Sequence, residues 1–297
     1  MKESLQKIVV TGGAGFVGTN LINLLLKKSK FKIISIDNYS SGSKKNHHIN
    51  RRVKYIKADT RSISTILKNK KNINTVFHFG EFSRIYQSFI KMNECINSNS
   101  VGTNAVFNYC LKNKIKLIYS ATSASLGNKG TDKNLSPYAF TKAKNLELLE
   151  NLKKWFNFKF EVIYFYNVYG PHQICKGKMA TVIGLFESHY KSKKPLPVVK
   201  PGTQTRRFTH IYDTVDICYE AWKKNLCRHY SIASHKSYSI LEVAKMFKTK
   251  IRFLPKRPGE RYTSAITNMN LSNKVYKYFG KINLNEYINS LLVDNIN

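Results

Sequence analysis

The chain has 297 residues, of which 42% are hydrophobic and 12% aromatic, and its formal net charge is +33. This apolar content suffices for one large domain or about two smaller ones, which excludes a disordered or fibrous chain. No run approaches the roughly 20 apolar residues of a membrane span, and the first residues lack the features of a signal peptide. We therefore expect a soluble, cytoplasmic protein with no membrane partner.

The positive charge comes from 50 lysine and arginine residues against 17 acidic ones, an excess that attracts polyanions. The lysines are spread over many segments and alternate with asparagine, so they form no single basic stripe. This distribution disfavours nucleic-acid binding, whereas acidic substrates such as diphosphates are favoured. The five cysteines are scattered without a CxxC pair, which predicts free thiols and no structural metal site.

Short β-rich runs alternate with helical stretches in the first half of the chain. Several runs are apolar on both faces, as in parallel strands covered by helices. The strand candidates are Lys7–Val10, Lys32–Ile36, Val53–Lys57, Thr75–Phe79, Lys116–Tyr119 and Glu161–Tyr166. The segments between them, such as Thr19–Leu26 and Asn99–Leu111, are long enough for crossover helices. This alternation predicts the α/β class, with a Rossmann-type doubly wound parallel sheet.

A glycine-rich turn, Gly12-Gly13-Ala14-Gly15-Phe16-Val17-Gly18, follows the first strand. Glycine allows the backbone to approach a pyrophosphate, which binds at the N-terminus of the next helix. Asp37 ends the second strand about 20 residues later, where a carboxylate can hold ribose hydroxyls and repel a 2′-phosphate. These features predict an NAD-binding domain over residues 1–166. Asp59, after the third strand, is expected to reach the adenine amino group, to cap the next helix, or both.

The alternation weakens beyond residue 166, where prolines and glycines become frequent. We expect residues 167–297 to form a smaller C-terminal α/β lobe that binds the substrate. The boundary is approximate, and segments of the two parts are expected to interleave.

A possible catalytic helix begins at Ser136-Pro137, with serine as the cap and proline in the first turn. Tyr138 and Lys142 are then four residues apart on one helical face. A nearby ammonium lowers the pKa of a phenol, so Tyr138 could accept a proton from a substrate hydroxyl. Thr122 follows the fifth strand, at the sheet edge where ligands bind; it could relay that proton or merely cap a turn.

In this order, the glycine turn, Asp37, the hydroxyl cluster and the Tyr138/Lys142 pair resemble the extended short-chain dehydrogenases/reductases. The resemblance is to the NAD-dependent nucleotide-sugar epimerases and dehydratases of the UDP-glucose 4-epimerase type, over nearly the whole chain. Further segments that carry it are Asp37–Gly42, His78–Gly80, Asn99–Asn104, Tyr166–Pro171, Gly202–Phe208 and Arg257–Glu260. His78 itself is expected to be a buried structural residue rather than a catalyst.

The resemblance implies a role for each matching position. Tyr138 is the implied base, Lys142 its partner and Thr122 the relay hydroxyl. The implied NAD contacts are Gly12, Gly15, Phe16, Val17, Gly18, Asp37, Asn38, Ser41, Gly42, Asp59, Thr60, Phe79, Gly80, Asn99, Tyr138, Lys142 and Tyr166. The implied substrate contacts are Ser83, Thr122, Asn167, Arg206 and Arg257, with the two arginines at the diphosphate. A homodimer through Asn99–Leu111 and Pro137–Trp155 is implied as well.

Three further places are informative, and at the first two of them the chain departs from the family pattern. Thr122-Ser123-Ala124 lacks the acid of the dehydratases, which favours C4 epimerisation of a nucleotide-diphosphate sugar. A 4,6-dehydratase, a 4-reductase and a non-catalytic NAD-binding protein with a basic RNA-binding surface remain alternatives. Glu81 follows Gly80 in place of a small residue and is expected to put a carboxylate near the sugar site. Ser264 falls where the epimerases gate the sugar's 2-substituent, and a small side chain there leaves room for an N-acetyl group.

Overall fold

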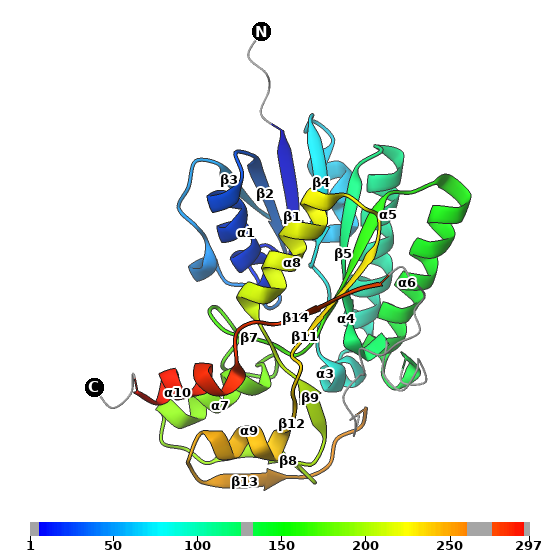
Figure 1. Cartoon of the computed structure of the whole chain (residues 1–297). Coiled ribbons are helices and arrows are strands. Elements are labelled where there is room, and N and C mark those ends of the chain that lie inside the picture. Colours follow the sequence, from blue (N-terminus) through cyan, green and yellow to red (C-terminus); the bar gives the residue numbers. More distant parts are fainter. Residues whose placement is uncertain (1–5, 126–132, 260–274, 294–297) are drawn as a thin grey trace.

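The computed structural model describes residues 6–125, 133–259 and 275–293. Its centre is an eight-stranded sheet with the order β14-β11-β6-β5-β4-β1-β2-β3, in which every neighbouring pair is parallel (Figure 1). The strands are β1 (Lys7–Thr11), β2 (Lys32–Asp37), β3 (Val53–Lys57), β4 (Ile73–His78), β5 (Lys116–Thr122), β6 (Phe160–Phe165), β11 (His229–Ala233) and β14 (Val275–Phe279). The order changes direction at β1, as in a doubly wound sheet. The predicted fold class is confirmed.

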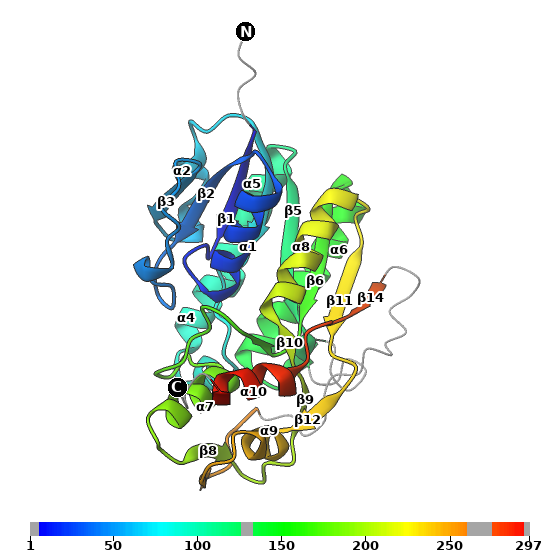
Figure 2. The same ribbon diagram turned by 60° about the vertical axis from the view of Figure 1, so that its left-hand side comes forward.

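Helices cover both faces of this sheet because alternate strand residues are apolar on each side. On one face lie α1 (Phe16–Lys28) and α8 (Ile211–Lys224) (Figure 2). Ile8 and Val10 pack in one apolar cluster with residues of these two helices. On the other face, Val9 packs in one cluster with residues of α2 (Ile63–Leu67), α5 (Thr103–Lys112) and α6 (Pro137–Phe156). Val9 and Val10 are fully buried, and they anchor the strand that leads into the glycine turn.

The six predicted strands are present, with ends that shift by up to three residues. Two further strands, β11 and β14, together with α8, come from beyond residue 167 and complete the sheet. The helix expected from Asn99 begins instead with a wide π turn over Asn97–Gly102 and becomes α-helical at Thr103. A Cβ on Gly102 would lie 2.4 Å from Thr60 Oγ1, so this turn approaches the neighbouring loop closely.

The remaining C-terminal elements form a smaller lobe below the sheet (Figure 1). Two-stranded pairs join β8 (Leu196–Val199) to β13 (Ile251–Leu254), β9 (Thr205–Arg207) to β12 (Ser237–Ser239), and β7 (Val168–Tyr169) to β10 (Thr209–His210). Helices α7 (Val182–Lys191), α9 (Ile240–Met246) and α10 (Leu284–Val293) enclose a separate apolar core. Two short helices, α3 (Ile85–Ile90) and α4 (Met92–Ile96), and 3-10 turns at Lys44–Asn46, Thr60–Ser62 and Ser123–Ser125 complete the described elements.

Within the described ranges, no helix combines the length and hydropathy needed to cross a membrane. The five cysteines are free thiols. No cluster of three or more histidine, cysteine or acidic side chains that could hold a metal ion occurs in the part of the chain that the structure describes.

Candidate active site

A pocket with a cavity volume of about 470 Å³ lies between the carboxyl ends of the strands and the smaller lobe. Its wall on the sheet side includes residues at or just beyond the ends of β1, β2, β4, β5 and β6, such as Gly12, Phe79 and Thr122. Its opposite wall includes Thr181, at the start of α7, and Arg206 from β9. Ligands bind at this edge of doubly wound sheets, where neighbouring crossover loops separate.

The glycine turn forms one end of the pocket. Gly12 has φ +69°, and a Cβ on it would lie 2.8 Å from the Phe79 carbonyl carbon. A Cβ on Gly18 would lie 2.1 Å from the Gly12 carbonyl oxygen, so a larger residue cannot be added without moving the turn. Phe16 and Val17 open α1 directly beside this turn and line the pocket with it. The backbone N–H groups of this first turn fit a pyrophosphate, so the residues present suit a dinucleotide.

Asp37 lies at the same end of the pocket, next to the turn. Its carboxylate accepts hydrogen bonds from the N–H groups of Ala14, at 3.0 Å, and Tyr39, at 2.7 Å. Burial raises the pKa of Asp37, and these backbone hydrogen bonds oppose the rise. Asn38, Ser41 and Thr60 extend this end of the lining. The carboxylate therefore ties the end of β2 to the glycine turn, at the position expected for a ribose.

Asp59 caps the Thr60–Ser62 turn, which was one of the two roles expected for it. Its Oδ1 accepts a hydrogen bond from the Arg61 N–H at 2.9 Å, at the start of the Thr60–Ser62 turn. Its Oδ2 accepts one from Asn38 Nδ2 at 3.3 Å. Burial acts to raise the pKa of Asp59, but the hydrogen bonds from Arg61 and Asn38 outweigh it and lower the pKa. Asp59 does not line the pocket itself, but it holds Asn38, which does.

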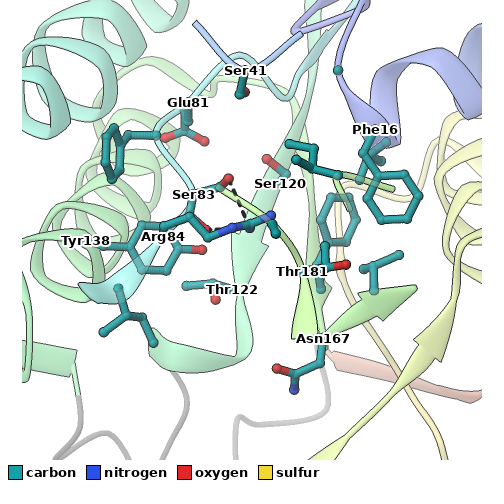
Figure 3. Close-up of a pocket in the computed structure, with 18 of the residues that line it drawn as sticks. Phe16, Ser41, Glu81, Ser83, Arg84, Ser120, Thr122, Tyr138, Asn167 and Thr181 are labelled. Carbon is teal, nitrogen blue, oxygen red and sulfur yellow. Dashed lines mark hydrogen bonds between the residues drawn. The ribbon is translucent and has the colours of Figure 1, made fainter. Parts of the chain in front are cut away.

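The predicted catalytic residues meet in the same pocket. The Ser136 hydroxyl accepts a hydrogen bond from the Ala139 N–H at 3.0 Å, and Pro137 occupies the first turn, so the predicted start of α6 is confirmed. Tyr138, Lys142 and Thr122 all line the pocket, and Figure 3 shows Tyr138 and Thr122 in it together with Ser83 and Asn167. Thr122 also caps the turn after β5, because its Oγ1 accepts a hydrogen bond from the Ala124 N–H at 3.2 Å.

The Lys142 ammonium lies deep in the wall, with the side chain 5% exposed. It donates hydrogen bonds to the Glu81 carboxylate and the Ser120 carbonyl, and it lies 4.6 Å from the centre of the Tyr119 ring. Burial lowers the pKa of Lys142, and the charge of Glu81 opposes this effect. The Glu81 side chain is only 3% exposed, so the carboxylate expected near the sugar is engaged mainly with the lysine.

Several predicted cofactor contacts have structural partners instead of a place in the lining. Asn99 is fully buried, and its side-chain amide pairs with both backbone groups of Phe82, at 2.6 and 3.0 Å. Tyr166 is 1% exposed, and its hydroxyl lies 2.9 Å from the Oγ of Ser231, which is on β11. Gly42 packs against Asp37, since a Cβ there would lie 2.9 Å from Oδ1. These residues support the segments that form the pocket, which the family motif alone does not reveal.

The predicted substrate residues Ser83, Asn167, Arg206 and Arg257 line the pocket. Arg257 places its guanidinium 5.1 Å from the centre of the Tyr86 ring, and Asn167 donates a hydrogen bond to the Arg207 carbonyl at 3.0 Å. The predictions for Glu260 and Ser264 lie outside the described residues.

Sequence reasoning missed Arg84, a third arginine in the lining. Its guanidinium donates hydrogen bonds to the carbonyls of Met179 and Ser83, each at 2.9 Å. Burial lowers the pKa of Arg84, and the neighbouring Tyr138 opposes the shift. Position 84 belongs to no motif of the resemblance, so only the fold could identify it. The three guanidinium groups make this pocket suitable for a phosphorylated ligand.

Comparisons with known proteins agree with this geometry. Residues 8–233 match the model of the NAD dependent epimerase/dehydratase family, and the chain belongs to that family. A putative UDP-glucose 4-epimerase of Methanocaldococcus jannaschii is 26% identical over 83% of each chain. The ADP-L-glycero-D-manno-heptose-6-epimerase of Brachyspira hyodysenteriae is 28% identical over 81% of this chain and 80% of its own length.

Among solved structures, the UDP-glucose 4-epimerase of Thermotoga maritima with UDP-glucose has the same fold, with a TM-score of 0.84 at 21% identity and 98% coverage of both chains. Membership of the family confirms the resemblance to the extended short-chain dehydrogenases/reductases and the prediction of NAD as cofactor. The protein is therefore an NAD-dependent enzyme of the epimerase/dehydratase type.

Proposed function

We propose that this enzyme interconverts C4 epimers of a nucleotide-diphosphate sugar, UDP-glucose and UDP-galactose or their N-acetyl forms, through a 4-keto intermediate. The observation that carries the proposal is the meeting of Tyr138, Thr122 and Lys142 in one pocket with the glycine turn and three arginines. Two of the relatives are named a putative UDP-glucose 4-epimerase and an ADP-L-glycero-D-manno-heptose-6-epimerase, which supports a nucleotide-linked sugar as the substrate.

In the proposed mechanism, Tyr138 removes the proton of the C4 hydroxyl, and Thr122 donates or accepts a hydrogen bond at the same oxygen. The positive charge of Lys142 favours the ionised form of Tyr138. NAD, when bound, supplies the acceptor and donor of the C4 hydride. Gly12, Phe16, Val17 and Asp37 would hold it.

The substrate must remain bound while its oxidised sugar turns over to present the opposite face. Arg206 and Arg257 are placed to hold the diphosphate, because guanidinium groups bind phosphate oxygens through paired hydrogen bonds. Ser83 and Asn167 line the same pocket and offer a hydroxyl and an amide to the sugar. The cycle consumes no cofactor, so NAD should co-purify with the protein.

The carboxylates in the pocket favour epimerisation over dehydration. Among the lining residues in the described ranges, the carboxylates are Asp37 and Glu81. The Asp37 carboxylate accepts a hydrogen bond from the glycine turn, and the Glu81 carboxylate forms an ion pair with Lys142. Ala124 stands where the dehydratases carry an acid. Proton abstraction at C5 therefore lacks a disengaged carboxylate, although product mass must separate the two reactions, because dehydration removes water.

The test is mass spectrometry of material released on denaturation, followed by assays with UDP-, GDP- and dTDP-sugars. We expect NAD to be released, and one sugar pair to interconvert without a change in mass. Tyr138→Phe should keep NAD and lose turnover, whereas Tyr212→Phe, at a side chain that is 47% exposed, should keep both. Unchanged turnover in Tyr138→Phe would remove the mechanism, and salt-sensitive RNA binding without sugar turnover would favour the non-catalytic alternative.

We further propose that the enzyme acts in the cytoplasm as a homodimer through Asn99–Leu111 and Pro137–Trp155. Exposed apolar side chains on these segments support a protein contact: Val101 is 49%, Phe140 43% and Trp155 62% exposed. Light scattering should give the mass of a dimer for the unmodified protein and that of a monomer for Phe140→Asp. A monomeric unmodified protein would contradict this part of the proposal.

A further inference from the structure

Glu81 is a buried carboxylate with four donors around it. Its Oε1 accepts hydrogen bonds from the Thr103 hydroxyl at 3.0 Å, the Tyr119 hydroxyl at 3.1 Å and the Asn145 amide at 3.3 Å. Its Oε2 pairs with the Lys142 ammonium. A carboxylate taken out of water is stabilised by such a set of donors, and the charged donor contributes most. The surroundings of Glu81 are therefore built for a carboxylate.

The same contacts fix the Lys142 ammonium. Besides Glu81, it donates hydrogen bonds to the Ser120 carbonyl and, at 3.4 Å, to the Tyr119 hydroxyl. Tyr119 in turn accepts a hydrogen bond from Asn145 at 3.1 Å. The partners of the ammonium therefore come from β5 and from the loop after β4, so two segments outside α6 hold it. Removal of the Glu81 carboxylate would leave the Lys142 ammonium without its negatively charged partner.

We propose that Glu81 is a positioning residue, which holds the Lys142 ammonium against the end of β5 and offsets part of its charge at Tyr138. Glu81 thereby sets the pH range in which Tyr138 is ionised. The inference rests on the proposed function only in that Tyr138 is taken as the base. Lys142 and Tyr138 are one turn apart on α6, so a charge on Glu81 acts on both.

Among the described residues, the other titratable groups around Lys142 and Tyr138 carry no negative charge, so Glu81 supplies the negative charge among these groups. Burial lowers the pKa of His78, on β4, to about 4, so it is neutral at physiological pH. Burial raises the pKa of Cys95, on α4, to about 11, so it remains a thiol. Burial raises the pKa of the Tyr119 phenol, on β5, so it remains protonated. Arg84 contributes a cation beside Tyr138.

The sign of the effect follows from these charges. Without Glu81, the positive charges of Lys142 and Arg84 act on Tyr138, and this set of groups no longer includes a carboxylate that opposes them. The ionised form of Tyr138 is therefore favoured. The midpoint of Tyr138 ionisation therefore moves to lower pH. The pKa of Lys142 also falls, because burial is no longer opposed by a carboxylate. Both limbs of a pH–activity profile are expected to move in the same direction.

The decisive experiment is an ultraviolet titration of phenolate formation in the purified protein with its bound cofactor. The signal of Tyr138 is isolated by subtracting a Tyr138→Phe protein made in each background. We expect Glu81→Gln to lower the midpoint by about one pH unit. Glu81→Asp keeps the charge but retracts it from Lys142, so its midpoint should lie between those of the unmodified protein and Glu81→Gln.

Glu161→Gln is the matched control. Glu161 is also a buried carboxylate, 0% exposed, that pairs with a lysine, Lys116, at 3.0 Å. It does not line the pocket. Loss of this carboxylate should destabilise the fold in a similar way while leaving the Tyr138 midpoint in place.

An unmoved midpoint in folded Glu81→Gln, or an equal shift in Glu161→Gln, would overturn the inference. Should Glu81→Gln fail to fold, Glu81→Asp alone must lower the midpoint, and an unmoved value there would also overturn it. The titration requires no substrate. Absence of turnover with every nucleotide sugar would therefore contradict the proposed function and leave the Glu81 result to stand on its own.

Discussion

Thr11 Oγ1 lies 2.7 Å from Nδ1 of His78, and Nε2 of the same ring lies 2.9 Å from Thr103 Oγ1. The Thr11 hydroxyl also accepts hydrogen bonds from the N–H groups of Phe79 and Gly80, each at 3.1 Å. One threonine, directly before the glycine turn, thus binds the segment that follows β4. This arrangement explains why Gly12 lies so close to Phe79 and why His78 serves the fold.

The buried state of His78 predicts a loss of stability in mild acid. Its pKa is about 4 in the folded protein and 6.5 in the unfolded chain. As the pH falls below 6.5, the unfolded chain binds a proton that the folded protein does not, so stability is lost until pH 4 is passed. Between pH 7 and pH 5 this loss is about 2 kcal/mol. Urea unfolding of the unmodified protein and of His78→Asn should show that this part of the slope disappears in the variant.

The exposed His235 supplies the control for this measurement, because His235→Asn should keep the slope of the unmodified protein. An equal pH dependence in His78→Asn and the unmodified protein would contradict the prediction, because it would mean that His78 binds protons equally in the folded and unfolded states.

Gly18→Ala should prevent tight NAD binding. The new Cβ would lie 2.1 Å from the Gly12 carbonyl oxygen, so the turn must open and its N–H groups must move. We expect affinity for NAD to fall about tenfold or more, which corresponds to at least about 1.4 kcal/mol. Calorimetric titration of cofactor-free protein measures it. Gly177→Ala is a control for backbone strain outside the turn, because Gly177 has φ +77° and no described atom lies within 4 Å of a Cβ there, so its affinity for NAD should not change. Equal affinity in both variants would argue against this turn as the pyrophosphate site.

Asp37→Asn should weaken the preference for NAD over NADP. The carboxylate that repels a 2′-phosphate is lost, and one of the backbone N–H partners, Ala14 or Tyr39, loses its acceptor. We expect the ratio of the two dissociation constants to change by about tenfold, a difference of about 1.4 kcal/mol. Asp216→Asn, which removes an exposed carboxylate paired with Lys28, should leave the ratio unchanged. An unaltered ratio in Asp37→Asn would place the ribose elsewhere.

Lys116→Met should destabilise the fold by about 3 kcal/mol. Its ammonium lies 3.0 Å from Glu161, which is fully buried. The same carboxylate accepts hydrogen bonds from the N–H groups of Cys227 and Arg228, so the variant retains these but leaves the charge unpaired. Denaturant unfolding measures the loss. The double variant Lys116→Met/Glu161→Gln should recover part of it, and an unchanged stability in the single variant would contradict the prediction.

Local features of the chain were predictable wherever they depend on neighbouring residues. The Ser136 cap and Pro137 specify the start of α6 by themselves, and this places Tyr138 and Lys142 on one helical turn. Likewise, the apolar residues of Lys7–Thr11 and the glycines after them specify a strand and a turn without reference to the rest of the fold. These are consequences of hydrogen bonding and backbone preference over a few residues.

Distant contacts were not predictable in this way. The sequence offered no reason for β11 to pair with β6, because the two strands are far apart along the chain. Arg84 lines the pocket because it directly precedes the short helix α3, and it lies outside any sequence motif. Asn99 and Tyr166 were expected to touch the cofactor. The Asn99 side-chain amide is instead hydrogen-bonded to the Phe82 backbone, and the Tyr166 hydroxyl is hydrogen-bonded to Ser231. In each case the partner belongs to a segment whose position depends on the whole fold.

The sequence by itself determined the α/β alternation, the glycine turn with Asp37, and the presence of a tyrosine and a lysine one helical turn apart, since each is specified by spacing along the chain. The tertiary structure alone decided which charges surround that pair. It brought Glu81 to Lys142 and Arg84 to the pocket, because burial and hydrogen bonding between distant segments fix where a charged side chain can be stabilised.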